Sequence, residues 1–157
     1  MSSNLYWPRE PYKGYEAFWA AEAAKLFAVV ILLEAGAENE LGKHAVAQVV
    51  INRCKDEYKR YGNGIHEVLL KKYQFSCLNP DSRDKALKLL WGVIPDSAIV
   101  MAAAFIDGHL VCPAADSANH YLNIELTKKG NDGKLPDWVN KMAHVITIGK
   151  HDFYKGI

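Results

Sequence analysis

The sequence LFAVVILLEAGAE, from Leu26 to Glu38, joins an unbroken apolar run to two carboxylates, Glu34 and Glu38. The run belongs to the longer segment Tyr15–Leu33, which is rich in Ala, Leu and Glu and contains neither Gly nor Pro. That composition predicts one long helix. Gly36 permits the helix to end just after the first acid. The sequence therefore predicts an apolar helix whose C-terminal end carries a carboxylate.

Further helices are predicted downstream of this segment. Their signals are apolar residues at helical spacing, or a capping residue before a stretch rich in Ala and Leu. In chain order these helices are Leu41–Cys54, a short one at most at Glu67–Lys72, then Arg83–Trp91 and Ser97–Asp107. The segment Tyr73–Arg83 is predicted to be a loop, with Asp81 or Ser82 as the cap of the helix that follows.

β-structure is predicted only late in the chain. His120–Ile124 is β-prone, and His144–Gly149 is an alternating, β-branched segment that predicts a strand. The intervening Thr127–Trp138 is rich in turn residues and is predicted to be a loop. We therefore expect a single domain over residues 1–157, of the α+β class and mainly helical, with an irregular N-terminal arm at residues 1–14.

The composition argues against several classes of protein. The chain has 157 residues, of which 50% are hydrophobic, and this suits one domain with a substantial core. A net charge of +1 gives no basic excess for nucleic acid, and no segment reaches the roughly 18 to 20 apolar residues of a membrane helix. The N-terminus lacks the basic start and apolar stretch of a signal peptide. We expect a monomer without a cofactor.

The three cysteines, Cys54, Cys77 and Cys112, are too few and too scattered for a disulfide framework. We expect reduced thiols, with Cys54 in the core. Cys77 beside Ser76 gives a weak signal for a cysteine nucleophile. Other nucleophile signatures, such as GxSxG, and glycine-rich phosphate loops are absent from the sequence.

Glu34 is the candidate catalytic acid. It follows Leu32 and Leu33, so its carboxyl is expected to border apolar surface, and such desolvation suits a general acid at neutral pH. A solvated helix end is the alternative, although the helix dipole disfavours a negative charge there. Glu38 would share a face with Glu34 if the helix continued past Gly36.

Six histidines leave a metal site open as a second possibility. The sequence has no HExxH motif and no closely spaced pair of ligands. His120, His144 and His151 nevertheless lie at the predicted β-segments and could gather round a zinc ion. That arrangement would make the protein a zinc-dependent amidase or peptidase, whereas structural hydrogen bonding is the simpler role for these side chains.

Four loop motifs pair aromatic rings with amide, imidazole, hydroxyl or carboxylate groups. Such surfaces suit sugars, which present apolar faces and hydroxyl edges. Each motif alone is more often part of a core, but four of them outside the predicted helices favour a groove that binds a glycan, with or without catalysis. The motifs are YQFS (73–76), NHY (119–121), PDW (136–138) and HDFY (151–154).

In their order along the chain, these pieces resemble the cell wall hydrolases related to spore cortex-lytic enzymes, a family that also occurs as bacteriophage endolysins. The resemblance covers about residues 30–155. It departs from the family at Gly36-Ala37, where an arginine is usual, and at Asn119, where a threonine is usual. The matching motifs are EAGAE (34–38), VAQVVINR (46–53), QFSC (74–77), NHY (119–121), PDW (136–138) and IGKHDFY (148–154).

The resemblance implies a lysozyme-like and transglycosylase-like domain that acts on the glycan strands of bacterial peptidoglycan. Enzymes of this kind cleave the bond between MurNAc and GlcNAc and leave a 1,6-anhydro-MurNAc end. By position, Glu34 would be the catalytic residue. The side chains expected to contact the substrate are Glu38, Gln74, Phe75, Ser76, Asn119, His120, Tyr121, Trp138, His151 and Tyr154.

A single acid is sufficient for a transglycosylase, whereas a glycoside hydrolase uses two carboxylates. In a lysozyme-type hydrolase, Glu38 or another acid such as Asp116 would be the second. A chain with neither a signal peptide nor a wall-binding repeat resembles an endolysin, which waits in the host cytoplasm until a membrane pore releases it to the wall. A bacterial enzyme exported by another route, or one carried in a phage particle, is the alternative setting.

Overall fold

The computed structural model describes residues 14–156, so the predicted N-terminal arm lies outside the described residues except for Gly14. Helices α1 to α6 form a helical body, and a small sheet with α7 follows it in the chain. The elements are α1 (Glu16–Ala20), α2 (Ala23–Ala35), α3 (Glu40–Cys54), α4 (Ile65–Leu70), η2 (Ser76–Leu78), α5 (Arg83–Trp91), α6 (Asp96–Ile106), η3 (Pro113–Ala115), β1 (His120–Leu122), α7 (Ile124–Lys129), η4 (Asp137–Asn140), β2 (Ala143–Ile148) and β3 (His151–Lys155), where η marks a 3-10 turn.

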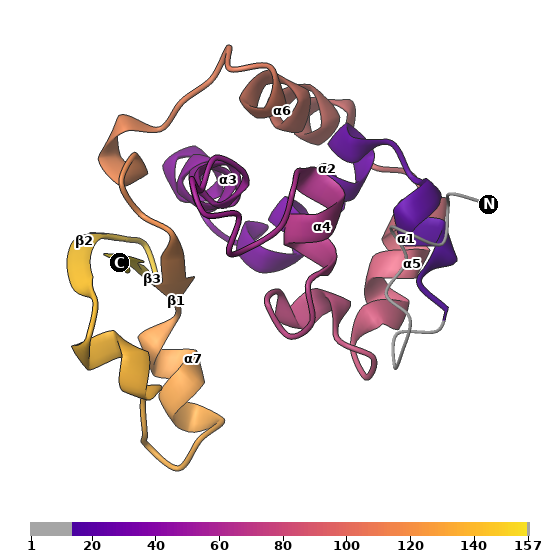
Figure 1. Cartoon of the computed structure of the whole chain (residues 1–157). Coiled ribbons are helices and arrows are strands. Elements are labelled where there is room, and N and C mark those ends of the chain that lie inside the picture. The colour runs from indigo at the N-terminus through magenta and orange to yellow at the C-terminus, as the bar shows by residue number, and fades with distance from the viewer. Residues whose placement is uncertain (1–13, 157) are drawn as a thin grey trace.

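Helix α2 lies at the centre of the helical body, where α3, α4, α5 and α6 pack against it (Figure 1). Residues 26–31 have no exposed surface. An apolar helix of this kind is stable only when other elements surround it, so α2 organises the core. Its last turn leaves the core at Glu34, which is half-buried. The burial of α2 therefore positions a carboxylate at the edge of the helical body.

The predicted single helix over Tyr15–Leu33 is wrong, because the structure has two helices there. The chain is extended at Ala21, which separates α1 from α2. The Ala21 carbonyl accepts a hydrogen bond from His66 Nε2 at 2.7 Å, and the His66 ring stacks on Trp19 at 6.1 Å. Packing against α4 thus ends the first helix where local propensity would have continued it.

The other predicted helices are confirmed to within one or two residues at each end, apart from the short one, which starts earlier, at Ile65. The cap of α5 is at Ser82, but the Ser82 side chain makes no capping hydrogen bond. Among residues 14–156, no single helix has the length and apolar composition of a membrane span. Helices α5 and α6 meet these two criteria only when taken together, as a pair bent by 104°.

The sheet is antiparallel with strand order β1–β3–β2. Figure 1 shows it with α7 on the side of the molecule away from α1 and α5. The two predicted strands are confirmed as β1 and β2, but the sequence does not predict β3 or α7. Helix α7 is too short for a periodic signal and depends on a cap, since Asn123 Oδ1 accepts from Leu126 N at 2.9 Å. Strand β3 is defined by its partners on both sides.

The polar side of α3 holds the segment that leads into the sheet. Gln48 Oε1 accepts a hydrogen bond from Cys112 N at 2.7 Å, and Gln48 Nε2 donates to Asn52 Oδ1 at 2.9 Å. Buried or partly buried carbonyls need hydrogen-bond donors, and three carbonyls of this segment obtain them from the side chain of Asn52. Asn52 Nδ2 donates to the carbonyls of Ala118 at 2.7 Å, Asp116 at 2.9 Å and Ala115 at 3.3 Å.

Replacing Asn52 by Ala should lower the free energy of unfolding by about 2–4 kcal/mol, because several carbonyls lose their donor. Asn52→Asp keeps the size and the acceptor but removes the donor, so it should destabilise at least as much. Asn140→Ala changes an exposed asparagine and is the control. Chemical denaturation measures all three, and an Asn52→Ala protein as stable as the control would contradict this role.

Candidate active site

A cavity of about 360 Å³ lies where the end of α2, the loop before η2, β1, α7 and the start of β3 meet. This volume is in the range of small-molecule sites. The predicted site residues Glu34, Gln74, Phe75, Ser76, Tyr121 and His151 are all part of its lining. The full lining consists of Leu33, Glu34, Arg53, Tyr73, Gln74, Phe75, Ser76, Tyr121, Leu122, Asn123, Leu126, Thr127 and His151.

Glu34 enters the cavity from the last turn of α2 and meets Tyr121 from β1. The Tyr121 hydroxyl donates to Glu34 Oε1 at 2.6 Å. Burial, followed by the charge and the hydrogen bond of Glu34, raises the pKa of Tyr121 well above its ordinary value, so the hydroxyl keeps its proton. Since Oε1 accepts from Tyr121, Oε2 is the carboxyl oxygen that this hydrogen bond leaves open.

The Cys77 thiol is a second donor to Glu34. Burial raises the pKa of Cys77, and the charge and hydrogen bond of Glu34 raise it further. A thiol that stays protonated is a poor nucleophile, because the thiolate is the reactive form. Cys77 therefore lies against the Glu34 carboxyl as a neutral thiol, which argues against the cysteine nucleophile that the sequence weakly signals. Burial likewise raises the pKa of Cys54 to about 11.

Arg53 brings a positive charge to the cavity from α3 and is only 6% exposed. Its Nε donates to the Asn119 carbonyl at 2.8 Å, and its Nη1 donates to Gln74 Oε1 at 3.3 Å. Burial lowers the pKa of Arg53, while nearby groups, Glu34 among them, oppose that effect. The cavity thus has an arginine although Gly36-Ala37 lacks the one that the family resemblance leads us to expect.

Glu38 does not share a helical face with Glu34, because α2 ends at Ala35. Its carboxylate turns instead to the tip of the β2–β3 hairpin. Glu38 Oε1 accepts from Lys150 N at 3.0 Å and lies 2.9 Å from His151 Nδ1, an ionic contact when the imidazole is protonated. Since these contacts occupy Glu38, it connects the corner between α2 and α3 to the sheet, and it does not line the cavity.

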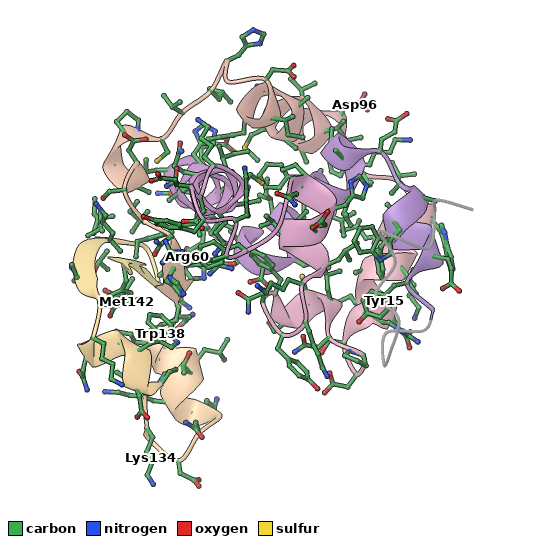
Figure 2. The ribbon with its side chains drawn as sticks, in the orientation of Figure 1. Tyr15, Arg60, Asp96, Lys134, Trp138 and Met142 are labelled. Atoms are coloured by element: carbon green, nitrogen blue, oxygen red, sulfur yellow. The ribbon has the colours of Figure 1, made fainter. Side chains whose placement is uncertain are left out.

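The remaining predicted site residues lie outside the cavity lining. His120, Trp138 and Tyr154 form an aromatic cluster, and Asn119 adjoins it at His120. The His120 and Trp138 rings lie 5.1 Å apart, and Trp138 meets the edge of Tyr154 at 5.5 Å. Figure 2 shows Trp138 at the sheet end of the molecule, away from Tyr15 and Asp96. Burial and the charges of two arginines lower the pKa of His120 to about 4, so it is neutral at neutral pH.

Asn119 has little hydrogen-bonding capacity left for a ligand. Its Oδ1 accepts from Gly156 N at 2.8 Å and lies 2.9 Å from His120 Nδ1. Its Nδ2 donates to the Gly156 carbonyl at 3.2 Å, and its backbone N donates to the Tyr154 carbonyl. Asn119 therefore fixes the end of β3 against β1.

The three histidines of the zinc hypothesis have separate partners. His120 faces Trp138 and Asn119, and His151 faces Glu38. His144 Nε2 lies 3.0 Å from both Asp152 Oδ1 and Thr147 Oγ1. Within residues 14–156, no three His, Cys, Asp or Glu side chains converge as a metal-ligand set. The arrangement of these side chains does not fit a zinc-dependent amidase.

Seven residues that line the cavity are not among the candidate site residues drawn from the sequence: Leu33, Arg53, Tyr73, Leu122, Asn123, Leu126 and Thr127. Two of them lie within motifs that the sequence does show, Arg53 in VAQVVINR and Tyr73 in YQFS. Tyr73 is 65% exposed and has a φ of 61°, a rare conformation for an aromatic residue that often marks a functional position. The α7 residues carry no such signal, because the sequence predicts no helix there.

A model of the Cell Wall Hydrolase family matches residues 37–154 of this sequence. The chain belongs to the Cell Wall Hydrolase family. The match begins just after Glu34 and covers α3, the cavity loop and all of the sheet except Lys155, so the family resemblance seen in the sequence motifs is confirmed. Comparison with curated protein sequences found no match.

Two solved structures resemble this cell wall hydrolase over nearly its whole length. One is the catalytic domain of the germination-specific lytic transglycosylase SleB from Bacillus anthracis, with 22% identity, a TM-score of 0.63 and coverage of 92% of this chain and 99% of that one. The other is the catalytic domain of the Bacillus cereus SleB protein, with 22% identity, a TM-score of 0.63 and coverage of 94% and 98%. The likeness confirms the predicted lysozyme-like fold, mainly helical with a small late sheet.

Gly149 should tolerate alanine much less well than Gly133 does. Both have positive φ, at 58° and 79°, but a Cβ on Gly149 would lie 2.6 Å from Glu38 Oε2, whereas Gly133 has open space. We expect Gly149→Ala to cost about 2–4 kcal/mol of unfolding free energy and Gly133→Ala about 1 kcal/mol. Equal losses in thermal or chemical denaturation would show that Glu38 does not hold the hairpin tip.

Proposed function

We propose that this cell wall hydrolase is a peptidoglycan lytic transglycosylase in which Glu34 is the catalytic residue. The observation that carries the proposal is the composition of the cavity. Among its lining residues, all within the described part of the chain, Glu34 is the single carboxylate. Glycoside hydrolases use two carboxylates, with a separation set by the mechanism. One acid in a cavity of this size favours a reaction in which the same group acts twice.

In the first step, Glu34 donates the proton on Oε2 to the glycosidic oxygen between MurNAc and GlcNAc. The bond from that oxygen to C1 of MurNAc breaks, and C1 acquires oxocarbenium character. In the second step, the Glu34 carboxylate takes the proton from the C6 hydroxyl of the same MurNAc. The C6 oxygen bonds to C1, which gives the 1,6-anhydro ring and returns Glu34 to its acid form. No water is consumed.

The neighbours of Glu34 suit this double role. Tyr121 and Cys77 remain protonated, so neither competes with Glu34 as a base. Their hydrogen bonds hold the carboxyl in one orientation. A catalytic group that is already oriented lowers the entropic cost of reaching the transition state. The positive charge of Arg53 stabilises the carboxylate that remains after the first proton transfer.

The side chains around Glu34 divide into groups that contact the sugar and groups that support them. Gln74 and Ser76 line the cavity and supply polar contacts for sugar hydroxyls, and the exposed ring of Tyr73 offers a stacking surface. Phe75 and Tyr154 are only 2% and 5% exposed, so we assign them supporting roles. Trp138, which is half-buried, is the ring of the aromatic cluster best suited to a further sugar.

A lysozyme-type hydrolase is the closest competitor, and it would need Glu38 or another acid to activate water. The engagement of Glu38 with Lys150 and His151 argues against that role. Glu38→Gln keeps the acceptor for Lys150 N and removes the charge. Under the transglycosylase proposal this variant retains activity, whereas loss of activity equal to that of a Glu34 variant would favour the hydrolase.

We also propose a setting for the enzyme, which is the lysis of a bacterial host by a phage. The support is the resemblance of the sequence motifs to a family that also occurs as bacteriophage endolysins. In this setting a monomer accumulates in the host cytoplasm and reaches the wall through a membrane pore. Expression in a bacterial host with and without a pore-forming protein tests it, since lysis should require both.

Glu34→Gln should reduce the clearing of cell-wall suspensions by a factor of at least about 10². Glutamine still accepts from Tyr121 but cannot supply the proton. Binding to the wall should not change, which separates catalysis from a non-catalytic glycan-binding role. Glu40→Gln is the matched control, because Glu40 is 76% exposed at the start of α3. If Glu34→Gln clears walls at the rate of that control, the proposed mechanism is wrong.

A further inference from the structure

A second, smaller hollow of about 170 Å³ adjoins the cavity of Glu34. It is lined by Asn123, Glu125, Leu126, Lys129 and Lys150, and it shares Asn123 and Leu126 with the larger cavity. The Leu126 side chain is 65% exposed. A ligand that fills the larger cavity can therefore extend over Leu126 into this hollow without crossing a wall of protein.

Two lysines from different elements give this hollow its charge. Lys129 comes from the last turn of α7, and Lys150 comes from the tip of the β2–β3 hairpin. Among residues 14–156, neither ammonium group has a carboxylate partner, and Glu125 is the single acid in the lining. The lining of the hollow thus has two lysine ammonium groups and one carboxylate. This excess of positive charge favours an anionic ligand.

The position of Lys150 is determined by the contacts that occupy Glu38. Glu38 Oε1 accepts from Lys150 N, and Glu38 also packs against Gly149. A lysine in the last turn of a helix, such as Lys129, has an ordinary explanation in the helix dipole. That explanation does not extend to Lys150, which a separate tether brings to the same hollow. The convergence of the two lysines therefore points to a ligand.

We propose that this hollow binds a carboxylate of the peptide that peptidoglycan carries on the lactyl group of MurNAc. The inference rests on the proposed function, since it assumes that a MurNAc unit of the substrate lies in the cavity of Glu34. The peptide begins at the lactyl group on C3 of the sugar and carries free carboxylates, so a short extension past Leu126 brings one to Lys129 and Lys150. The enzyme would then prefer glycan strands that still carry their peptides.

Anionic wall polymers with phosphodiester groups offer the same charge, but they attach to the C6 oxygen of MurNAc. The reaction proposed for Glu34 needs that oxygen as a free hydroxyl on the MurNAc that it cleaves. A phosphodiester on the reacting sugar would therefore block the chemistry. The peptide, which is attached at C3, leaves C6 free, and this favours the peptide carboxylate as the occupant.

The test compares two glycan substrates from one wall preparation that has first been stripped of phosphate polymers. One retains its peptides, and the other has lost them to an amidase, which leaves only the shorter lactyl carboxylate on each MurNAc. The test variant is Lys129→Gln/Lys150→Gln. The control is Lys134→Gln/Lys141→Gln, in which both lysines are exposed and lie outside the two cavities; Figure 2 places Lys134 at the tip of the loop after α7. The readout is kcat/KM for each substrate.

The wild-type protein and the control should prefer the peptide-bearing strands by about three- to tenfold, as expected for two solvent-exposed charge contacts. The test variant should lose this preference while its kcat/KM on the peptide-free strands stays unchanged. The wild-type preference should also weaken as ionic strength rises. Restoring the phosphate polymers should add nothing to the preference.

Three results would overturn the inference while leaving Glu34 as the catalytic residue. The wild type could show no preference, the test variant could keep the preference of the control, or the preference could follow the phosphate polymers. Failure of the proposed function gives a different result, because Glu34→Gln would then remain active on both substrates.

Discussion

The hydrogen bonds of Asn52 are the constraint on which the position of the sheet depends. One amide group serves three carbonyls of the segment just before β1, and Gln48 holds that amide in place. Arg53 continues the connection by donating to the Asn119 carbonyl. The buried helix α2 supplies Glu34 from one side, and α3 delivers β1 with Tyr121 from the other. The site exists because these two helices pack against each other.

The two acids of the EAGAE motif have different partners, and this separates their roles. Glu34 faces a cavity and is held by donors that keep their protons. Glu38 holds the hairpin tip through Lys150 and His151. Glu38 therefore connects the corner after α2 to the hairpin, and in the mechanism that we propose it does not activate water. The same tether positions Lys150 beside the smaller hollow.

The sequence predicts those parts of the fold that have a local cause. Burial of α2 and the periodicity of α3 are visible as apolar patterns, and the fold class follows from them. The break at Ala21 has no local cause, because it comes from His66 on another helix. Helix α7 depends on a cap, so its part of the cavity wall, Leu126 and Thr127, could not be predicted. Strand β3 depends on its strand partners, although its cavity residue His151 is visible in the HDFY motif. The separation of Glu38 from Glu34 likewise needs the hairpin, which is distant in sequence.

The central claim is that Glu34 acts alone, first as acid and then as base, without an activated water. Digestion of purified peptidoglycan in isotopically labelled water, followed by mass spectrometry of the glycan fragments, tests it most directly. The account predicts MurNAc ends that are lighter than hydrolytic ends by one water molecule and that carry no label. Reducing MurNAc ends that carry the label would show that water attacks the sugar and would contradict the account.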